Sequence, residues 1–334
     1  MKTLVRAAVL TNFFEVAREL GLDPQPLLRK VGLSRALLKD PEQRIPADAA
    51  VALLEESAQQ AHCADFGLRM AESRQLSDFG VVSLLISHQP TLRDALTTTI
   101  QYRHLLNDTL AMQIEDAGKM VIVREEVVSQ LPARQATELA IGVLYRMCSA
   151  LLGSRWRPCS VNFTHEAPPD RRLHKRMFAC PLEFGSEFNG FVCTAADLDA
   201  PNPAADPAMA RYARQFVESL PLVSEPSVVL DVRKAIYLML PTGRASSEYV
   251  AQGLGLSVRT MQRQLDEAGA SFTELLNEVR RELAQRYIEN PRYAMVRISE
   301  LLGYSTPSSF TRWFIAQFGT APQTWRAMQK RTRP

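Results

Sequence analysis

Two groups of hydrogen-bonding side chains near the C-terminal end of the chain have a spacing suited to reading DNA bases. In each group the residues follow one another at i, i+3 and i+4, which places all three in one stripe along a helix. Arginine donates two hydrogen bonds to guanine and glutamine pairs with adenine in the major groove. The stripes therefore predict two helices that enter the major groove. They are Arg259, Gln262 and Arg263, and Ser308, Thr311 and Arg312.

The first stripe lies in a predicted helix-turn-helix unit over 246–267. Ser246 is a suitable N-cap for its first helix, and Gly255 lies in the tight turn that follows. Ser257 is a suitable N-cap for the second helix, which carries the stripe, and Gly269 ends that helix.

The second stripe lies in a matching unit over 295–318. Thr306 as N-cap and Pro307 at the first helical position mark the start of its reading helix, and Gly319 marks the end. Ser309 lies at the edge of this stripe. The apolar residues behind the two stripes occupy corresponding places: Met261 and Leu265 in the first unit, and Phe310 and Phe314 in the second.

Nine polar residues of these two units are candidate DNA contacts. A solvated polar face is the better explanation for a single isolated stripe, but the second copy reverses that preference. The second stripe has shorter side chains, so we expect it to hold phosphates more than bases, which fixes position without reading sequence. The candidates are Ser257, Arg259, Gln262, Arg263, Thr306, Ser308, Ser309, Thr311 and Arg312.

The segment between the two units predicts a rigid spacer. A helix over 272–289 begins at a capping box formed by Ser271 and Glu274. It spans about 27 Å at 1.5 Å per residue, close to the roughly 34 Å between major-groove entries one turn apart. Such a spacer presents both reading helices to one face of the duplex, with some bending of the DNA.

The distribution of charge favours a nucleic-acid partner for the C-terminal third alone. From Asp231 onward the chain has 15 Lys and Arg against 9 Asp and Glu, whereas the preceding part has 24 against 27. The hydrophobic content of 46% and charged content of 22% are ordinary for a globular protein. No apolar run approaches the roughly 18 residues of a membrane span, and the N-terminus has no signal-peptide pattern. We therefore expect a cytoplasmic protein without a membrane partner.

The front part of the chain predicts an α+β domain that is mostly helical, with a small antiparallel sheet. It precedes an all-α C-terminal domain with two helix-turn-helix units. Prolines cluster between the two, so we place an N-terminal domain at 1–222, a linker at 223–228 and a C-terminal domain at 229–334. The expected helices cover 3–20, 24–31, 46–61, 65–72, 79–88, 92–106, 132–152, 171–178 and 208–220, and the expected strands cover 110–115, 120–127, 160–164, 182–184 and 190–194.

One cluster in the front domain suits an anionic small molecule. An arginine and a histidine together could hold a carboxylate or phosphate. The alternative is that the arginine is a surface residue and the histidine a packing residue. The candidate effector-binding residues are Tyr102, Arg103, His104, Asn107 and Arg124.

Patterns for enzymatic chemistry are missing from the sequence. It has no nucleophile elbow, phosphate-binding loop or dinucleotide fingerprint. No histidine pair has the spacing of a metal site, and the five cysteines, which form no C-x-x-C pair, read as reduced thiols. We therefore predict no catalytic residues, no metal site and no cofactor.

The C-terminal part, from about 229 to 328, resembles the AraC/XylS-type transcription regulators. This resemblance implies DNA contacts by Arg259, Gln262 and Arg263 in the first reading helix, and by Ser308, Ser309 and Arg312 in the second. One departure is Trp325, where the family usually has tyrosine. The resemblance depends on three ordered runs and a final pair: Ile298-Ser299-Glu300-Leu301-Leu302-Gly303-Tyr304-Ser305, Ser309-Phe310-Thr311-Arg312-Trp313-Phe314, Phe318-Gly319-Thr320-Ala321-Pro322, and Trp325-Arg326.

A looser resemblance over about 20–200 is to the N-terminal domain of ornithine-utilisation-type regulators within that family. It implies effector sensing and self-association. The matching residues are Asp78-Phe79-Gly80-Val81-Val82, Thr91-Leu92-Arg93-Asp94-Ala95-Leu96, Tyr102, Phe188-Asn189-Gly190-Phe191 and Asp197-Leu198.

The sequence thus predicts a sequence-specific, DNA-binding transcriptional regulator, an activator that responds to a small-molecule effector. Its expected partners are double-stranded promoter DNA, the effector, RNA polymerase and a second copy of the chain. Two alternatives remain open: a DNA-bound adaptor that needs no effector, and a DNA-repair methyltransferase fused to an AraC-like module. The methyltransferase requires close cysteine pairs for zinc, which this sequence does not contain.

Overall fold

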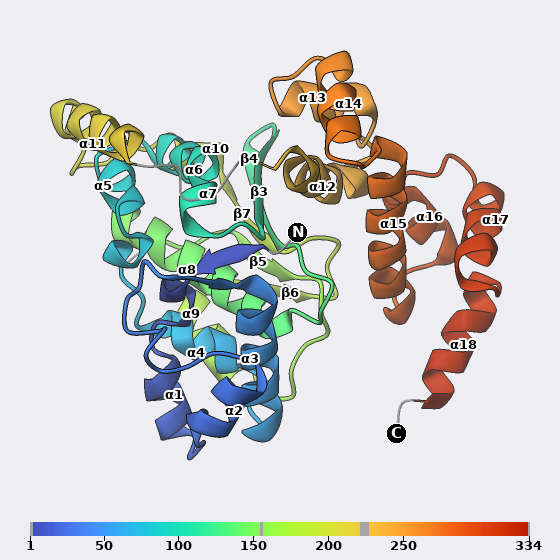
Figure 1. The fold of residues 1–334 in the computed structure, drawn as a ribbon, viewed down its shortest axis with the longest axis horizontal. Helices are drawn as coiled ribbons and strands as arrows, with labels where there is room; N and C mark the ends of the chain where they lie inside the picture. The colour runs from blue at the N-terminus through green and yellow to red at the C-terminus, as the bar shows by residue number, and fades with distance from the viewer. Residues whose placement is uncertain (1–2, 154–155, 221–226, 333–334) are drawn as a thin grey trace. The chain divides into compact units, whose positions relative to one another are not determined.

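The computed structural model describes residues 3–153, 156–220 and 227–332. The chain divides into two compact units, Met1–Ser224 and Glu225–Pro334 (Figure 1). Most of the linker expected at 223–228 lies outside the described residues. The domain bounds 1–222 and 229–334 therefore remain a proposal.

Helices make up most of the N-terminal unit, and a long central helix, α8, packs against α3, α4 and strand β4. Most of these helices match the ranges expected from the sequence. They are α1 (Phe13–Glu19), α2 (Pro24–Lys30), α3 (Ala47–Gln60), α4 (Phe66–Glu72), α5 (Val82–Ser87), α6 (Leu92–Gln101), α7 (Arg103–Leu106), α8 (Arg134–Leu152), α9 (Arg172–Phe178), α10 (Ala195–Leu198) and α11 (Pro207–Ser219), with 3-10 turns η1 (Ala7–Leu10) and η2 (Leu76–Phe79).

The single amphipathic helix expected over 3–20 is wrong. The chain begins with strand β1 (Leu4–Arg6), passes through η1 and becomes α-helical only at α1. Strand β1 pairs antiparallel with β2 (Arg44–Pro46), and Val5 and Ile45 are buried at the centre of this pair. Strand β2 is remote in sequence, so the spacing of apolar residues within 3–20 could not indicate this pairing.

Two other expected helices are shorter than the sequence pattern suggested. Gly80 has a backbone φ of 57°, outside the helical region, and it separates η2 from α5 within 79–88. Tyr102 lies between α6 and α7 and divides the helix expected over 92–106.

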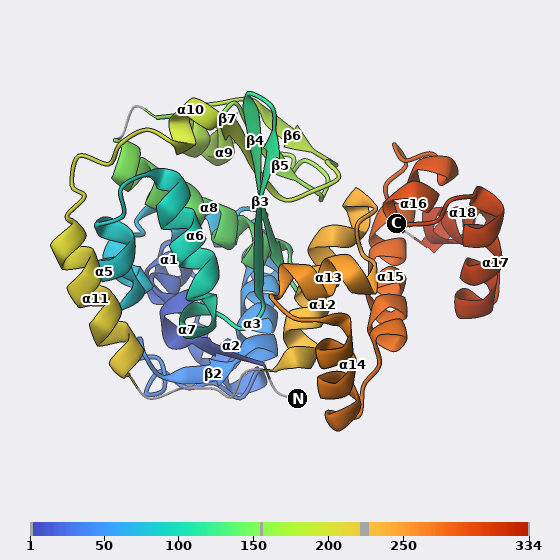
Figure 2. The same ribbon diagram turned by 90° about the horizontal axis from the view of Figure 1, so that it is seen from above.

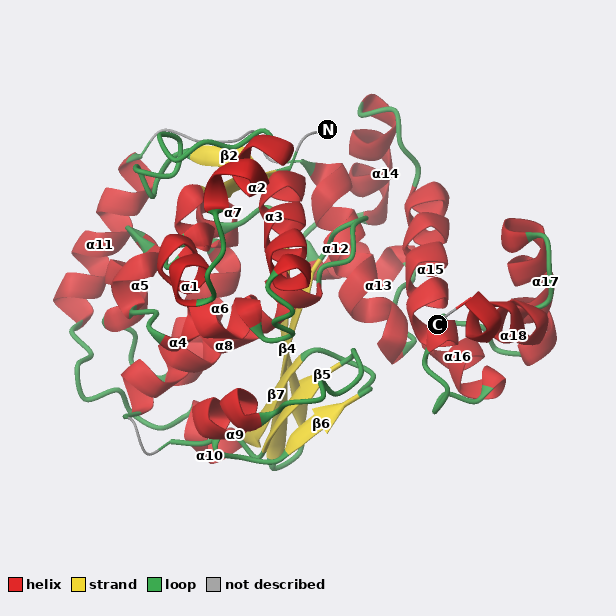
Figure 3. Cartoon of the chain, turned by 90° about the horizontal axis from the view of Figure 1, so that it is seen from below, coloured by secondary structure: helices red, strands yellow, loops and turns green. Residues whose placement is uncertain are grey.

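Five strands form the main sheet of the N-terminal unit, in the order β3-β4-β7-β5-β6 (Figure 3). The hairpin of β3 and β4 forms as expected. One pair corrects the expectation of an antiparallel sheet, because β5 and β6 are parallel and α9 forms the crossover between them. The strands are β3 (Leu110–Ala117), β4 (Met120–Val127), β5 (Ser160–Phe163), β6 (Leu182–Phe184) and β7 (Gly190–Thr194).

A glycine allows the central strands β4 and β7 to approach each other. Gly190 has a φ of 138°, and a Cβ atom there would lie 2.0 Å from the carbonyl oxygen of Val123. Only glycine avoids that clash. The resulting pairing aligns Val123 with Phe191, both fully buried, beneath α8.

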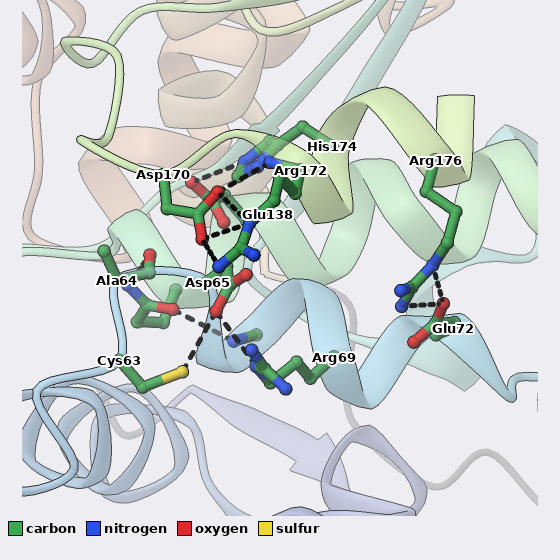
Figure 4. A network of polar contacts seen from close by, with 12 residues as sticks. Cys63, Ala64, Asp65, Arg69, Glu72, Glu138, Asp170, Arg172, His174 and Arg176 are labelled. Atoms are coloured by element: carbon green, nitrogen blue, oxygen red, sulfur yellow. Dashed lines mark hydrogen bonds and ion pairs between the residues drawn. The ribbon is translucent and has the colours of Figure 1, made fainter. Parts of the chain in front are cut away.

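A polar network joins α4, α8 and α9 on the helical side of this unit (Figure 4). The Glu138 side chain on α8 is fully buried, and its Oε1 lies 3.2 Å from Nε2 of His165 and 3.3 Å from Nε2 of His174. Burial opposes ionisation of Glu138, but the contacts with the two histidines outweigh it and lower its pKa to about 2. At the surface, Arg176 on α9 forms an ion pair with Glu72 on α4.

The C-terminal unit is entirely helical among its described residues. In Figures 1 and 2, α15 stands between α14 and α17. The sequence pattern predicted helical structure to the end of the chain but gave no bounds for the last helix, α18. The elements are α12 (Val228–Met239), η3 (Leu240–Thr242), α13 (Ser247–Gly253), α14 (Val258–Glu267), α15 (Phe272–Glu289), α16 (Met295–Leu301), α17 (Pro307–Phe318) and α18 (Pro322–Thr332).

Candidate nucleic-acid interface

Helix α14 carries the first polar stripe with its predicted boundaries. The Ser257 side chain accepts a hydrogen bond from the backbone N–H of Thr260 and caps the helix. Met261 and Leu265 are fully buried behind the stripe. Gly269 follows the helix with a φ of 70°, a conformation that glycine adopts without strain.

The three stripe residues of α14 are all exposed to solvent. Arg259 and Gln262 have no hydrogen bond or ion pair with any described residue. Arg263 donates to Glu267 one turn away on the same helix, at 3.0 Å. An exposed pair of this kind contributes about 0.5 kcal/mol or less, so it is readily exchanged for a contact with DNA.

Helix α17 carries the second stripe. The Thr306 side chain accepts a hydrogen bond from the backbone N–H of Ser309, and the hydroxyls of these two residues lie 2.9 Å apart. The hydroxyl of Thr311 donates to the carbonyl of Pro307 within the same helix. Three of the expected hydroxyl contacts therefore have partners in their own helix.

Two members of the second stripe, Ser308 and Arg312, are exposed and have no partner among the described residues. Ile315 lies one turn further along the same face, and 44% of its surface is exposed. Sequence reasoning missed Ile315, although its i+3 spacing from Arg312 was a usable signal. An exposed aliphatic side chain in the major groove suits the methyl group of thymine.

An aromatic cluster holds α17 in place. Phe310 and Phe314 are buried, and the ring of Phe318 stacks on Phe314 with centroids 4.3 Å apart. Trp325 of α18 packs against Phe318 with centroids 5.2 Å apart. The residue that departs from the usual family pattern, Trp325, thus completes the support of the second reading helix.

The spacer helix α15 contacts the second helix-turn-helix unit and helix α12 through two arginines that the sequence analysis did not single out. Arg280 donates from Nε to the carbonyl of Leu302, in the turn of the second unit, at 3.1 Å. Its guanidinium also lies over the ring of Tyr304, 4.7 Å from the centroid. Toward the first unit, Arg233 of α12 forms ion pairs with Glu278 and Glu282 of α15. Because α12 in turn packs against α13 and α14, these contacts connect both units to the spacer helix, the first one by way of α12.

Four of the five expected effector residues lie at and after the junction of α6 and α7, but they do not converge. Tyr102 is buried, with its hydroxyl 3.4 Å from a carboxylate oxygen of Glu218 on α11. Arg103 donates to a backbone carbonyl of its own helical segment, and the Asn107 side chain accepts from the backbone of Thr109. His104 is exposed.

The fifth expected effector residue, Arg124 on β4, contacts Glu115 and Phe188 and none of the other four residues. Its Nε donates to a carboxylate oxygen of Glu115 at 3.0 Å, and its guanidinium lies 4.7 Å from the centre of the Phe188 ring. The structure therefore does not assemble the anion site that the sequence suggested from these five residues. Spacing along the chain placed them close together, but apart from the ring contact between Tyr102 and His104 the structure shows no contact among their side chains.

Within the described ranges, no group of three or more His, Cys, Asp or Glu side chains is arranged to hold a metal ion. A search of the same ranges finds no helix that combines the length and apolar character needed to cross a membrane. The five cysteines are free thiols.

Two capped helices that carry polar stripes, joined by one spacer helix, define the C-terminal unit as a double helix-turn-helix module. Comparison with known proteins identifies the protein family. Residues 21–202 match the arabinose-binding domain of AraC transcription regulators, and residues 250–328 match a helix-turn-helix domain. This chain belongs to the AraC family of DNA-binding transcription regulators, and this family is not one of enzymes.

Particular relatives align along almost their whole length. The transcriptional regulator VirS of Mycobacterium tuberculosis is 30% identical over 329 residues, which cover 97% of each chain. The ornithine utilization regulator of Pseudomonas aeruginosa is 25% identical, with 97% of this chain and 96% of that one covered. The crystal structure of CdpR from Pseudomonas aeruginosa aligns over 93% of this chain and 97% of that chain, with 20% identity and a TM-score of 0.44.

Proposed function

We propose that this protein activates transcription by binding promoter DNA through α14 and α17, and that a small molecule bound by the N-terminal unit controls this activity. The observation that carries the proposal is the pair of polar stripes, each exposed on a capped helix whose opposite face is buried. The nine candidate contacts are assigned to DNA on this basis. Arg259, Gln262 and Arg263 contact bases. In the second helix, Ser308 and Arg312 contact DNA, because their side chains are exposed and have no partner among the described residues.

The response to an effector is supported by the class of the N-terminal domain, which in the matched family is described as arabinose-binding. One relative is named for ornithine utilization, which connects a regulator of this length with small-molecule metabolism. The competing hypothesis is a DNA-bound adaptor without an effector. The two differ in whether a metabolite changes promoter binding.

We also propose that a second copy of the chain and RNA polymerase are partners, and that the protein acts in the cytoplasm where its DNA lies. Support for self-association comes from α11, where Met209, Tyr212 and Phe216 are 47%, 60% and 49% exposed. These large apolar residues follow one another at i, i+3 and i+7 along one face. Exposed apolar faces often mark protein–protein contacts, and most soluble oligomers are symmetric assemblies of identical chains.

The decisive experiment maps where the protein binds its own genome, with and without candidate metabolites. The Arg259→Ala/Gln262→Ala double variant should lose the specific sites. Gln25→Ala/Arg29→Ala is a matched control, because these residues are exposed on α2 of the other unit at the same kind of spacing. Unchanged occupancy in the first variant would refute base reading by α14. Occupancy and transcription that no metabolite alters would favour the adaptor.

A further inference from the structure

A partly open cavity of about 130 Å³ lies in the N-terminal unit, where its two apolar cores meet. One core contains α1 to α4, and the other lies between α8 and the main sheet. Small side chains leave the space open: Ala47 and Ala50 on α3 face Ala136 and Ala140 on α8 across it. An apolar cavity of about 150 Å³ is large enough to hold benzene, so this one fits a ligand of similar size.

One carboxyl group in this cavity has no partner. Glu125 of β4 lines the cavity, is 3% exposed, and its Oε2 has no hydrogen-bond partner among the described residues. Its strand neighbour Glu126 points to the other face and bonds to the side chain of Asn189. Leaving a buried polar atom unpaired costs about 1–3 kcal/mol, so such atoms are rare in folded proteins.

The other polar side chains around the cavity are bonded, and among their buried atoms in the described residues the Nε of Arg74 alone has no partner. Arg74 donates to the carbonyls of Ala8 and Val9, and Arg6 bonds to Glu42. The remaining polar lining residues are bonded as well: Asp78 to the backbone of Gln75, Thr99 to the carbonyl of Ala95, and Asn107 to Thr109. Glu125 therefore presents an unpaired carboxyl oxygen to a cavity that is otherwise mostly apolar.

We infer that this cavity, here called the Glu125 cavity, binds a compact, mostly hydrocarbon molecule whose end group, a hydroxyl or an amine, donates a hydrogen bond to Glu125. The inference rests on the proposed effector response and names the site and chemical class of the effector. Burial raises the pKa of Glu125 to about 8, and the adjacent Glu126 adds to this, so the carboxyl is largely uncharged at neutral pH and ionises only when a cationic amine pairs with it.

The same geometry disfavours two other ligand classes. A carboxylate end would lose its hydration and meet a second carboxyl group, while Arg6 and both Nη atoms of Arg74 are already bonded. A free amino acid would bury two charges, and one of them would find no partner. The anion site predicted from the sequence is thus replaced by a site of different chemistry.

The test uses the full-length protein and four probes of one size: toluene, benzyl alcohol, benzylamine and benzoate. Binding is measured by calorimetric titration and by thermal shift. We expect benzyl alcohol and benzylamine to bind about fivefold or more tightly than toluene, since one net hydrogen bond contributes about 1 kcal/mol. Benzoate should bind more weakly than toluene. No binding by any probe, or benzoate binding as tightly as benzyl alcohol, would overturn the inference.

Two variants locate the site. Glu125→Met removes the unpaired carboxyl at similar volume, so it should fold at least as stably; it should keep toluene binding and lose the preference for benzyl alcohol. Ala140→Leu fills the cavity and should weaken every probe, whereas Ala150→Leu on the exposed face of α8 should weaken none. A preference for benzyl alcohol that survives in Glu125→Met would overturn the assignment of Glu125.

Promoter binding is measured in the same samples. This second measurement distinguishes a failure of the cavity proposal from a failure of the proposed effector response. Probe binding that alters promoter affinity supports both. Probe binding that leaves promoter affinity unchanged upholds the Glu125 cavity and counts against the effector response. A promoter response to a metabolite that persists in Ala140→Leu places the effector elsewhere and refutes the inference.

Discussion

At the scale of single residues, the nine candidate DNA contacts differ in how free the fold leaves them. Arg259, Gln262 and Arg312 are exposed and unpartnered among the described residues, whereas Thr311 is bonded to its own helix. A hydroxyl already bonded within its helix contributes less to base recognition than a free guanidinium. We therefore expect sequence discrimination to come mainly from α14.

Arg263→Ala tests base reading by a single side chain. We expect a loss of about 1–3 kcal/mol at one base pair, and relaxed preference there, because a bidentate arginine–guanine contact is lost. Competition binding with operator variants measures this. Glu267→Gln is the control, because it breaks the ion pair with Arg263 without removing the arginine. Equal weakening on all DNA sequences would reassign Arg263 to a phosphate.

Glu138 is a second residue whose state depends on its surroundings. Its lowered pKa of about 2 lies below the usual value near 4.5, so its ionised form stabilises the folded state. That contribution is complete above about pH 4.5 and is lost as the pH falls toward 2. Glu138→Gln should cost about 3 kcal/mol or more at pH 6, because the histidines lose a charged buried partner.

Denaturant unfolding at a series of pH values measures this effect. The difference between wild type and Glu138→Gln should shrink from pH 4.5 downward. Glu72→Gln breaks only the exposed pair with Arg176 and should cost less than about 1 kcal/mol. A difference between wild type and Glu138→Gln that does not change with pH would contradict the role assigned to the charge of Glu138.

At the scale of elements, the spacer helix α15 decides whether the two reading helices act together. It begins at the capping box of Ser271 and Glu274, as expected, and spans about 27 Å. Near the middle of α15, the Arg280 side chain contacts Leu302 and Tyr304 in the turn between α16 and α17. This contact couples the second reading helix to the spacer.

Arg280→Met should remove that coupling while keeping the apolar stem of the side chain. We expect at least about fivefold weaker binding to DNA that carries both half-sites, since a lost hydrogen bond and a lost cation–π contact each contribute about 1 kcal/mol. Binding to a duplex with only the first half-site should not change. Gln285→Met, at an exposed position of the same helix, is the control. An equal loss on both duplexes would show general unfolding instead.

At the scale of the whole molecule, the C-terminal unit has its own core and carries both polar stripes. Val232, Ile236, Val279, Leu283 and Ile298 are buried within it. A fragment of residues 225–334 should therefore fold alone and bind promoter DNA, with a melting transition of its own. Gel-shift and circular dichroism measurements test this.

The fragment should also no longer respond to any metabolite that controls the full chain. A fragment that folds but binds only in the presence of the N-terminal unit would show that self-association provides the decisive affinity. A fragment that does not fold would contradict the division into two independent units.

Local signals made the C-terminal unit predictable in detail. Ser257 and Thr306 as caps, Pro307 at a first helical position and Gly319 beyond a last one gave helix boundaries that the structure reproduces within about one residue. Each signal acts through backbone groups one turn away, so sequence alone is sufficient to read it.

Contacts between residues far apart in sequence were not predictable in this way. The pairing of β1 with β2 and the parallel pairing of β5 with β6 depend on partners brought together by the fold. By itself the sequence determined two capped helices with polar stripes, the spacer between them and the family, because these depend on local periodicity and capping. Only the tertiary structure decided which polar groups remain free: it paired Arg124 with Glu115 and left Glu125 without a partner, since burial and pairing depend on every neighbour at once.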